Sequence, residues 1–244
     1  MAREVIALLD LNGSERILDV GCGDGKITAE IASRAPRGSV VGVDPSGDMI
    51  SFAQSHYDSS ARPNLRFQVA DARSLPFQND FDRVVSFNAL HWVPEQEAAL
   101  SSIHSALISG GKAQLRLVPP GTRKSLEKIV EETRRTSRWS AYFQDFHDPY
   151  LRLTSEEYAA MAECNGFCVL RVSTKDHAWD FGSRAAFSAF CAVGCVAWTG
   201  RLPETERADF INDVLDRYQI VAADCSGEEK IFKFYQMDIS LLAT

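Results

Sequence analysis

Glycine occupies every second position of the segment Gly21-Cys22-Gly23-Asp24-Gly25, which directly follows the mostly apolar run Ile17–Val20. Because glycine has no Cβ, such a turn lets a ligand lie against bare backbone. A dinucleotide-binding loop needs the spacing Gly-x-Gly-x-x-Gly, whereas here the third glycine comes one residue early and Lys26 stands in its place. Asp19, in the same region, would repel a pyrophosphate. The segment therefore favours a nucleoside ligand that carries a positive group.

Polar side chains follow each of the next three predicted strands. Asp44 ends the second strand, where a carboxylate can accept hydrogen bonds from both hydroxyls of a ribose. Asp71 and Ala72 follow the third strand, where a side-chain acceptor and a backbone N–H can read an adenine edge, and Asn88 ends the fourth. Since open parallel sheets bind ligands beyond the carboxyl ends of their strands, these residues predict one site. The predicted cofactor-binding residues are Asp19, Gly21, Gly23, Gly25, Asp44, Pro45, Met49, Asp71, Ala72 and Asn88.

Short apolar strands alternate with helical segments over the first 120 residues. The predicted strands are 17–21, 40–44, 65–70, 82–88 and 112–118, and the predicted helices are 26–34, about 49–57 and 95–108. The last of these helices is expected to end at Gly110-Gly111. Strands that alternate with helices imply an α/β fold with a parallel sheet and right-handed crossovers.

The second half of the chain has a different character. Helices are predicted at 123–138, from Thr154 or Ser155, at 184–200 and at 203–219, with strands up to about 174 and at 231–242. Residues 139–153 are aromatic and loop-like. With no repeat and no linker in sight, we predict a single domain over 1–244. Residues 1–120 form its cofactor-binding core, 121–230 largely a lid with substrate insertions, and 231–244 the last strand.

Residues 15–118 resemble class I methyltransferases that use S-adenosylmethionine. The resemblance rests on Asp19–Gly25, Gly42–Ser46, Asp71-Ala72 and Gly110-Gly111. It implies a Rossmann-like, mostly parallel seven-stranded sheet with an antiparallel last strand, helices on both faces and a helical lid inserted in the second half. It also implies S-adenosyl-L-methionine as the cofactor and S-adenosyl-L-homocysteine as its product. The ammonium and sulfonium groups of this cofactor match the positive groups that the glycine turn favours.

The run Ser86–Val93, with Trp92 near its end, is similar to small-molecule carboxyl methyltransferases, such as those acting on juvenile hormone acid, trans-aconitate or malonyl carrier protein. The resemblance implies a small organic acid as substrate. Its carboxylate is ionised at pH 7 and needs no strong general base. The predicted catalytic residues are Trp92, whose indole N–H can donate a hydrogen bond to the acid, and His91, as donor or base. Arg116 either pairs with an anionic substrate or lies at the surface or against a helix.

The composition of the chain limits which classes of binding partner we expect. The chain has 244 residues, a net charge of −7 and no apolar run of the ~20 residues that a membrane span needs. The acidic balance disfavours nucleic acid, as does Asn88–His91, which lacks the Pro-Pro motif of DNA amino-methyltransferases. Six cysteines are too few for a disulfide scaffold, and their spacing is not that of a metal site. We expect a cytoplasmic monomer or homodimer with a small-molecule substrate, no metal, no membrane span and no nucleic acid.

Three other functions remain open from the sequence. A methyltransferase acting on a ring carbon or a phenolic oxygen, as in quinone or natural-product pathways, would need a base, for which His91 is the adjacent candidate. A non-catalytic cofactor-binding protein is the second alternative, because only about 15 residues precede the first strand, where the carboxyl methyltransferases carry a substrate-binding helix. An NAD-dependent oxidoreductase is the third, and the glycine spacing counts against it.

Overall fold

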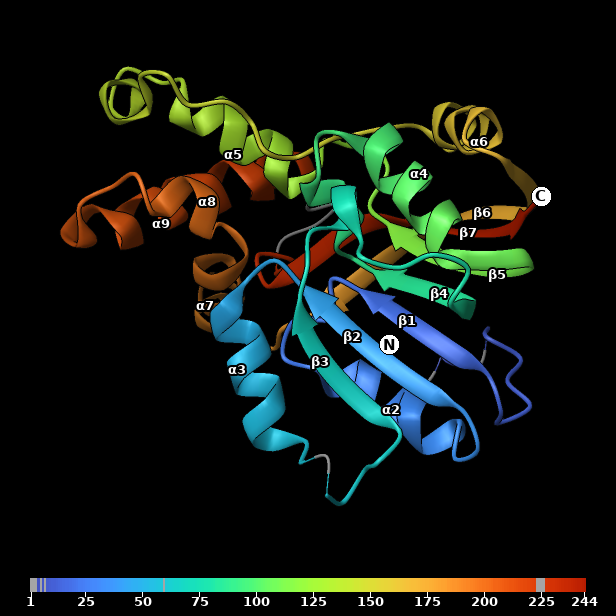
Figure 1. The fold of residues 1–244 in the computed structure, drawn as a ribbon. Helices are drawn as coiled ribbons and strands as arrows, with labels where there is room; N and C mark the ends of the chain where they lie inside the picture. The colour runs from blue at the N-terminus through green and yellow to red at the C-terminus, as the bar shows by residue number, and fades with distance from the viewer. Residues whose placement is uncertain (1–3, 5, 7, 59, 223–226) are drawn as a thin grey trace. The chain divides into compact units, whose positions relative to one another are not determined.

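The computed structural model describes residues 4, 6, 8–58, 60–222 and 227–244 (Figure 1). The strands are β1 Arg16–Val20, β2 Ser39–Asp44, β3 Leu65–Val69, β4 Phe81–Phe87, β5 Leu107–Leu117, β6 Phe167–Asp180 and β7 Ile231–Ala243. They form one sheet in the order β3-β2-β1-β4-β5-β7-β6. Neighbours from β3 to β5 pair in parallel, and β7 pairs antiparallel with β5. The predicted Rossmann-like sheet with an antiparallel last strand is confirmed.

Helices cover both faces of this sheet. Those of the sheet-forming half are α2 Lys26–Arg34, α3 Gly47–His56, α4 Gln96–Ala106 and α6 Ser155–Cys164, with 3-10 turns η1 Ala72–Ser74 and η2 Leu90–Trp92. In Figure 1, α4 and α6 lie above the sheet and α2 lies below it. The helix predicted at 26–34 is confirmed at both ends, because Gly25 precedes it with a left-handed backbone (φ 78°) and Pro36 follows it closely.

The predicted helix end at Gly110-Gly111 is wrong. Helix α4 ends at Ala106, and β5 begins at Leu107 and runs through both glycines. The pairing of β4 with β5 shifts register between Phe81 and Arg83, and Gly110 has φ 75°. A positive φ in a strand marks a bulge, which glycine accommodates without strain. The two glycines therefore signal an irregular strand, not a helix end.

The chain divides into two compact units. The first comprises 1–117, 155–174 and 237–244, and the second 118–154 and 175–236. The second unit carries α5 Leu126–Arg134, η3 Ser140–Phe143, α7 Arg184–Gly194, α8 Val196–Thr199 and α9 Glu204–Ala222. The helix predicted at 184–200 is broken at Cys195, between α7 and α8. The prediction of one domain with a lid over 121–230 stays a prediction; residues 155–174 group with the first unit.

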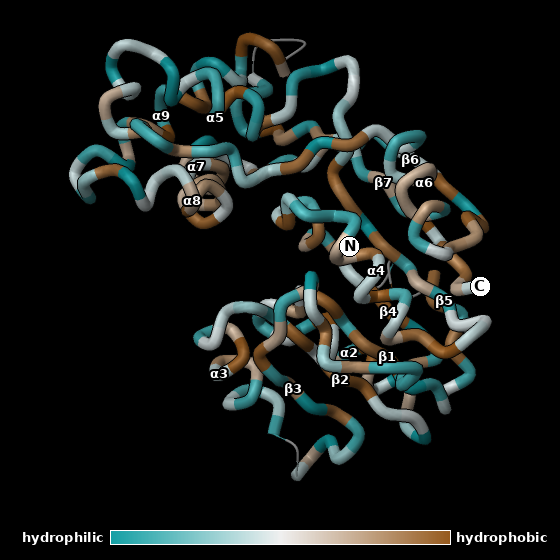
Figure 2. Tube along the Cα trace, turned by 45° about the horizontal axis from the view of Figure 1, so that its top comes forward, coloured by the Kyte–Doolittle hydropathy of each residue, from teal (hydrophilic) through white to brown (hydrophobic). Residues whose placement is uncertain are grey.

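Each unit has its own hydrophobic core. In the first, Ile17, Ile31 and Val40 are fully buried between the strands and α2. In the second, Trp139 and Trp198 are fully buried among the helices. Figure 2 shows hydrophobic stretches along the central strands β1, β4 and β5. This apolar support holds the strand ends that carry the site.

Candidate active site

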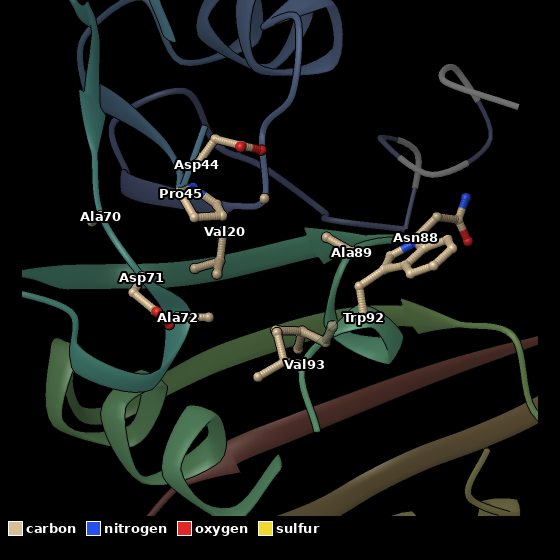
Figure 3. Close-up of a pocket in the computed structure, with 12 residues that line it drawn as sticks. Val20, Asp44, Pro45, Ala70, Asp71, Ala72, Asn88, Ala89, Trp92 and Val93 are labelled. Atoms are coloured by element: carbon tan, nitrogen blue, oxygen red, sulfur yellow. The ribbon is translucent and has the colours of Figure 1, made fainter. Parts of the chain in front are cut away.

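A cavity of about 300 Å³ opens at the carboxyl ends of the parallel strands. It is lined by Val20, Gly21, Asp44, Pro45, Ala70, Asp71, Ala72, Asn88, Ala89, Leu90, Trp92 and Val93. All of them belong to the first compact unit. Figure 3 shows Asp44 and Pro45 on one side of the cavity and Asn88 and Trp92 on the other. The strand order reverses between β1 and β4, and such a switch point is where open α/β sheets bind ligands.

The three glycines of the turn are glycine for different reasons. All have a positive φ: 78° at Gly21, 53° at Gly23 and 78° at Gly25. A Cβ on Gly21 would lie 2.2 Å from the Cβ of Ala89, and one on Gly25 would lie 2.7 Å from the ring of Phe67. At Gly23 nothing lies within 4 Å. Packing alone therefore accounts for the missing side chain at two positions, and the open space at Gly23 is where a ligand can approach the backbone.

Asp44, the last residue of β2, is fixed by hydrogen bonds from the glycine turn and from the residue two positions further on. Its two carboxylate oxygens accept hydrogen bonds from the backbone N–H groups of Gly23, at 3.0 Å, and Ser46, at 2.9 Å. These bonds hold the side chain in one orientation at the end of β2. Each oxygen keeps lone pairs for a further donor. The arrangement can accept hydrogen bonds from two neighbouring hydroxyls.

Asp19 lies within β1 and is 2% exposed. The hydroxyl of Thr28 donates to its Oδ2 at 2.6 Å. Burial, with a smaller contribution from the negative charge of Asp44, raises the pKa of Asp19 to about 6. Among the described residues, Asp19 is not part of the cavity lining. Its effect on a ligand there would therefore come through its charge rather than by contact.

Asp71 caps the turn η1 on the cavity wall. Its carboxylate accepts hydrogen bonds from the backbone N–H of Arg73 at 2.9 Å and from the guanidinium Nη2 of the same residue at 2.6 Å. Arg73 holds the pKa of Asp71 below its ordinary value. The carboxylate is therefore ionised at neutral pH, beside the backbone N–H of Ala72.

Asn88 has a left-handed backbone (φ 57°), a conformation that costs energy for a residue other than glycine. Its N–H donates to the carbonyl of Arg116 at 2.9 Å. The side chain of Arg116 is 1% exposed and binds both oxygens of Asp238, at 2.7 and 2.9 Å, across the β5–β7 pair. Arg116 is thus buried and bound to Asp238 of the neighbouring strand, so it does not lie at the surface.

The two predicted catalytic residues lie in different environments. Trp92 is 36% exposed and lines the cavity. His91 is 5% exposed and outside the described lining, and burial lowers its pKa to about 3. Met49, predicted to pack on a base, is 43% exposed on α3 and is also absent from the lining. The structure therefore brings Trp92 to the predicted site, but neither His91 nor Met49.

Residues 17–111 match the family model of the methyltransferase domain. The chain is 29% identical over 217 residues to juvenile hormone acid O-methyltransferase of Drosophila melanogaster, covering 84% of this chain and 71% of that relative. It is 34% identical over 110 residues to trans-aconitate 2-methyltransferase of Deinococcus radiodurans, and that alignment covers 45% of this chain and 40% of the relative. The chain is a methyltransferase that uses S-adenosylmethionine.

The fold of this methyltransferase recurs in a solved structure. Phosphoethanolamine N-methyltransferase 2 of Haemonchus contortus, solved in complex with S-adenosyl-L-methionine, superposes with a TM-score of 0.63 at 17% identity. The match covers 99% of this chain and 52% of that one. This superposition supports the fold, while the family match and the sequence relatives confirm the predicted resemblance and the predicted enzyme class.

The residues around the cavity suit the cofactor of this methyltransferase. S-adenosylmethionine carries a sulfonium and an ammonium, and the buried carboxylate of Asp19 together with Asp44 supplies negative charge nearby. Its ribose diol matches the two oriented oxygens of Asp44. Open space at Gly23 lets the chain of the cofactor lie against the turn. The donor set and the shape of the turn therefore fit the group.

Sequence reasoning missed five residues of the cavity wall. They are Val20, Ala70, Ala89, Leu90 and Val93. Each is apolar and adjoins a residue or segment that the motifs single out. Their signal was position alone, because a residue next to a strand-end motif shares its edge of the sheet. Arg73 was missed as well, since its contact with Glu95 depends on how η1 folds against the start of α4.

Within the described ranges, no group of three His, Cys, Asp or Glu side chains is placed to hold a metal ion. Among the described helices, none is both long and apolar enough to cross a membrane.

Proposed function

We propose that this methyltransferase transfers its methyl group to a carboxylate oxygen of a small organic acid. The observation that carries the proposal is the position of His91, which is 5% exposed and outside the described cavity lining, and whose burial lowers its pKa to about 3. A base this weak cannot take a proton efficiently near neutral pH. Phenolic oxygens and ring carbons must lose a proton to become nucleophiles, whereas a carboxylate is already ionised. Because His91 is buried outside the described cavity lining and is a weak base, the site favours an acid over acceptors that must first lose a proton.

The cofactor residues have distinct roles in this proposal. The cofactor supplies an activated methyl group on a sulfonium, and the protein supplies binding and alignment. Asp44 accepts hydrogen bonds from the ribose hydroxyls, while Asp71 and the N–H of Ala72 read the adenine. Asn88 and the turn from Gly21 to Gly25 contact the methionine part, with Asp19 attracting its positive charges. Pro45 contributes to the wall beside the ribose.

Trp92 orients the acceptor in this proposal. Its side chain lines the cavity, and its indole N–H can donate one hydrogen bond to one oxygen of the acid. The other oxygen would then be free to attack the methyl carbon in line with the S–CH3 bond, which breaks to leave the thioether of S-adenosylhomocysteine. The ring also excludes water from one side of the carboxylate, which makes the anion more reactive. We leave His91 out of the chemistry and assign it a packing role.

Two relatives support an acid as acceptor. One is named for O-methylation of an acid, and the other for trans-aconitate, which is itself a carboxylate. Both identities are near 30%, a level at which acceptors commonly differ. The names therefore support the reaction type and leave the individual acid to experiment.

The direct test offers the enzyme matched acceptors with methyl-labelled cofactor. The set contains carboxylic acids of several chain lengths, their primary amides and phenols of similar size. We expect label in the acids alone, and mild alkali should release it as methanol, because esters hydrolyse while ethers and C-methyl groups do not. Label that enters the phenols and resists alkali would overturn the proposal in favour of a phenolic or ring-carbon acceptor.

The substitution Trp92→Phe tests the role of the indole N–H. It should lower turnover about tenfold, the value of one hydrogen bond to a charged group, and leave the affinity for S-adenosylhomocysteine unchanged. Trp179→Phe is the matched control, because Trp179 is also an exposed tryptophan (47%) but belongs to the second unit. Unchanged turnover in Trp92→Phe would remove Trp92 from the mechanism.

A further inference from the structure

Arg73 donates several hydrogen bonds to the carboxylate of Asp71, the residue that reads the adenine in the proposed function. Its backbone N–H and its Nε donate to Asp71 Oδ1 at 2.9 and 3.0 Å. The same Nε lies 3.1 Å from Oδ2, and Nη2 donates to Oδ2 at 2.6 Å. On its other side, Nη1 donates to Glu95 Oε2 at 3.1 Å. The guanidinium is therefore held between two carboxylates, one on the cavity wall and one at the start of α4.

These contacts use most of the hydrogen-bond acceptor positions of the Asp71 carboxylate. A carboxylate offers about four lone-pair positions. Three N–H donors of Arg73 occupy three of them, with Nε shared between the two oxygens. One position is left, and one of the two N–H groups of a base amino group can donate to it. The hydrogen bonds from Arg73 therefore decide which lone-pair position of Asp71 remains available to a ligand.

Stability alone does not account for this arrangement. The side chains of Arg73, Asp71 and Glu95 are 47%, 36% and 56% exposed. Exposed ion pairs of this kind contribute little to folding, because solvent screens them. Their effect on direction is different, since a bidentate fork fixes the plane of the carboxylate. Glu95 in turn holds the guanidinium from the far side.

We propose that Arg73 is a positioning residue that sets how strictly the enzyme recognises the 6-amino group of the cofactor's adenine. It does so by orienting Asp71, and Glu95 assists by fixing Arg73. The proposal rests on the proposed role of Asp71 as the residue that reads the base. Lysine cannot replace Arg73 here, because a single ammonium cannot make the side-on pair with both oxygens.

The test compares two ligands by calorimetry. One is S-adenosylhomocysteine, and the other is its analogue with purine in place of adenine, which lacks only the amino group. The wild-type enzyme should prefer the adenine compound by about tenfold, because the analogue leaves an acceptor of Asp71 without its donor. The ratio of the two dissociation constants is insensitive to a general loss of fold, which weakens both ligands alike.

We expect Arg73→Ala and Arg73→Lys to reduce this ratio by about threefold, mainly by weakening the adenine compound. Glu95→Gln should reduce it by less. The matched control is Arg66→Ala, which removes an exposed arginine from β3, the strand before Asp71, and should leave the ratio unchanged. A ratio that stays at the wild-type value in both Arg73 variants would overturn the proposal.

Failure of this proposal is separable from failure of the proposed function. If the wild-type enzyme binds both ligands equally, Asp71 does not read the amino group, and the positioning role falls with it. The acceptor assay with labelled cofactor is unaffected by that result. Conversely, a phenolic product would overturn the proposed acceptor while leaving the ligand ratios, and hence the role of Arg73, intact.

Discussion

The glycine turn and the buried cluster around Glu131 are organised in opposite ways. In the turn, the residues that matter are close in sequence, and backbone conformation fixes them. In the second unit, the carboxylate of Glu131 is 2% exposed and accepts the indole N–H of Trp198, 67 positions away, at 2.6 Å. Arg134 donates to both of its oxygens at 2.8 and 2.9 Å. One region is specified by local spacing, and the other by a contact that only folding creates.

This difference separates residues that matter for ligand binding from residues that matter for folding. The turn exposes its backbone beside the cavity, so substitutions there should first change the affinity for the ligand. The Glu131 cluster joins α5 to α8 inside a hydrophobic core, so changes there should affect folding first. Substitutions in each region can therefore break or sharpen the comparison.

Glu131→Ala should have the largest effect on stability. Although burial opposes ionisation, the bonds from Arg134 and Trp198 hold the pKa of Glu131 below its ordinary value. Removing the carboxylate leaves Arg134, which is 9% exposed, without its charge partner. We expect a loss of about 4 kcal/mol in the free energy of unfolding, measured in urea.

The matched control for Glu131 lies next to it on the same helix. Glu132 pairs with Lys124 at 3.0 Å in solvent, so Glu132→Ala should cost less than about 1 kcal/mol. At a temperature where both variants remain folded, the affinity for S-adenosylhomocysteine should equal that of the wild type. A large loss of affinity in folded Glu131→Ala would contradict the division of roles between the two regions.

Two alanine substitutions in the turn should behave differently from each other. Gly21→Ala should cost about 3 kcal/mol, from a left-handed alanine plus the collision of its Cβ with Ala89. Gly23→Ala carries the same backbone penalty without the collision, so it should cost about 1 kcal/mol. Its methyl group would occupy the open space at the turn, and we expect it to weaken S-adenosylhomocysteine about tenfold or more.

The double variant Gly21→Ala with Ala89→Gly isolates the collision. Removing the methyl group of Ala89 should restore part of the stability that Gly21→Ala loses, as measured by urea unfolding. No restoration would mean that backbone strain, rather than packing, keeps position 21 as glycine.

The same contrast explains what the sequence could predict. Strand positions and helix α2 follow from local periodicity, so residues such as Ile17 and Ile31 were assigned correctly from spacing alone. Gly110-Gly111 was misread, because pairing with β4 decides whether two glycines end a helix or bulge a strand. The break at Cys195 was missed for a similar reason: the apolar run continues through it, while the chain turns there to bury Trp198.

The same distinction explains which site residues could be predicted from the sequence. Strand-end residues such as Asp44 and Asn88 reached the cavity because the topology of a parallel sheet gathers strand ends at one edge. Met49 did not, since the phase of α3 turns it toward solvent. The burial of His91 and the hydrogen bond from Arg73 to Glu95 depend on contacts between elements, which spacing does not encode.

Asp19 offers the smallest but most direct test of the turn's electrostatics. Its folded pKa of about 6 lies above its ordinary value of 3.8. The neutral acid therefore contributes stability that is fully present below about pH 4 and is lost as the pH rises through 6. In the cofactor-free enzyme, unfolding free energy should fall over this window, and Asp19→Asn should flatten that part of the profile.

Ligand affinity should move in the opposite direction over the same window. A ligand with a sulfonium and an ammonium favours the ionised form of Asp19, so S-adenosylmethionine should bind about fivefold tighter at pH 7 than at pH 5. Asp19→Asn should remove most of this dependence, whereas Asp24→Asn, in the exposed part of the turn, should preserve it. A pH profile shared by the wild type and Asp19→Asn would assign the dependence to another group. Asp19 would then serve the fold, through its hydrogen bond with Thr28, rather than attract the cofactor, and the turn would resemble the Glu131 cluster more closely than its sequence suggests.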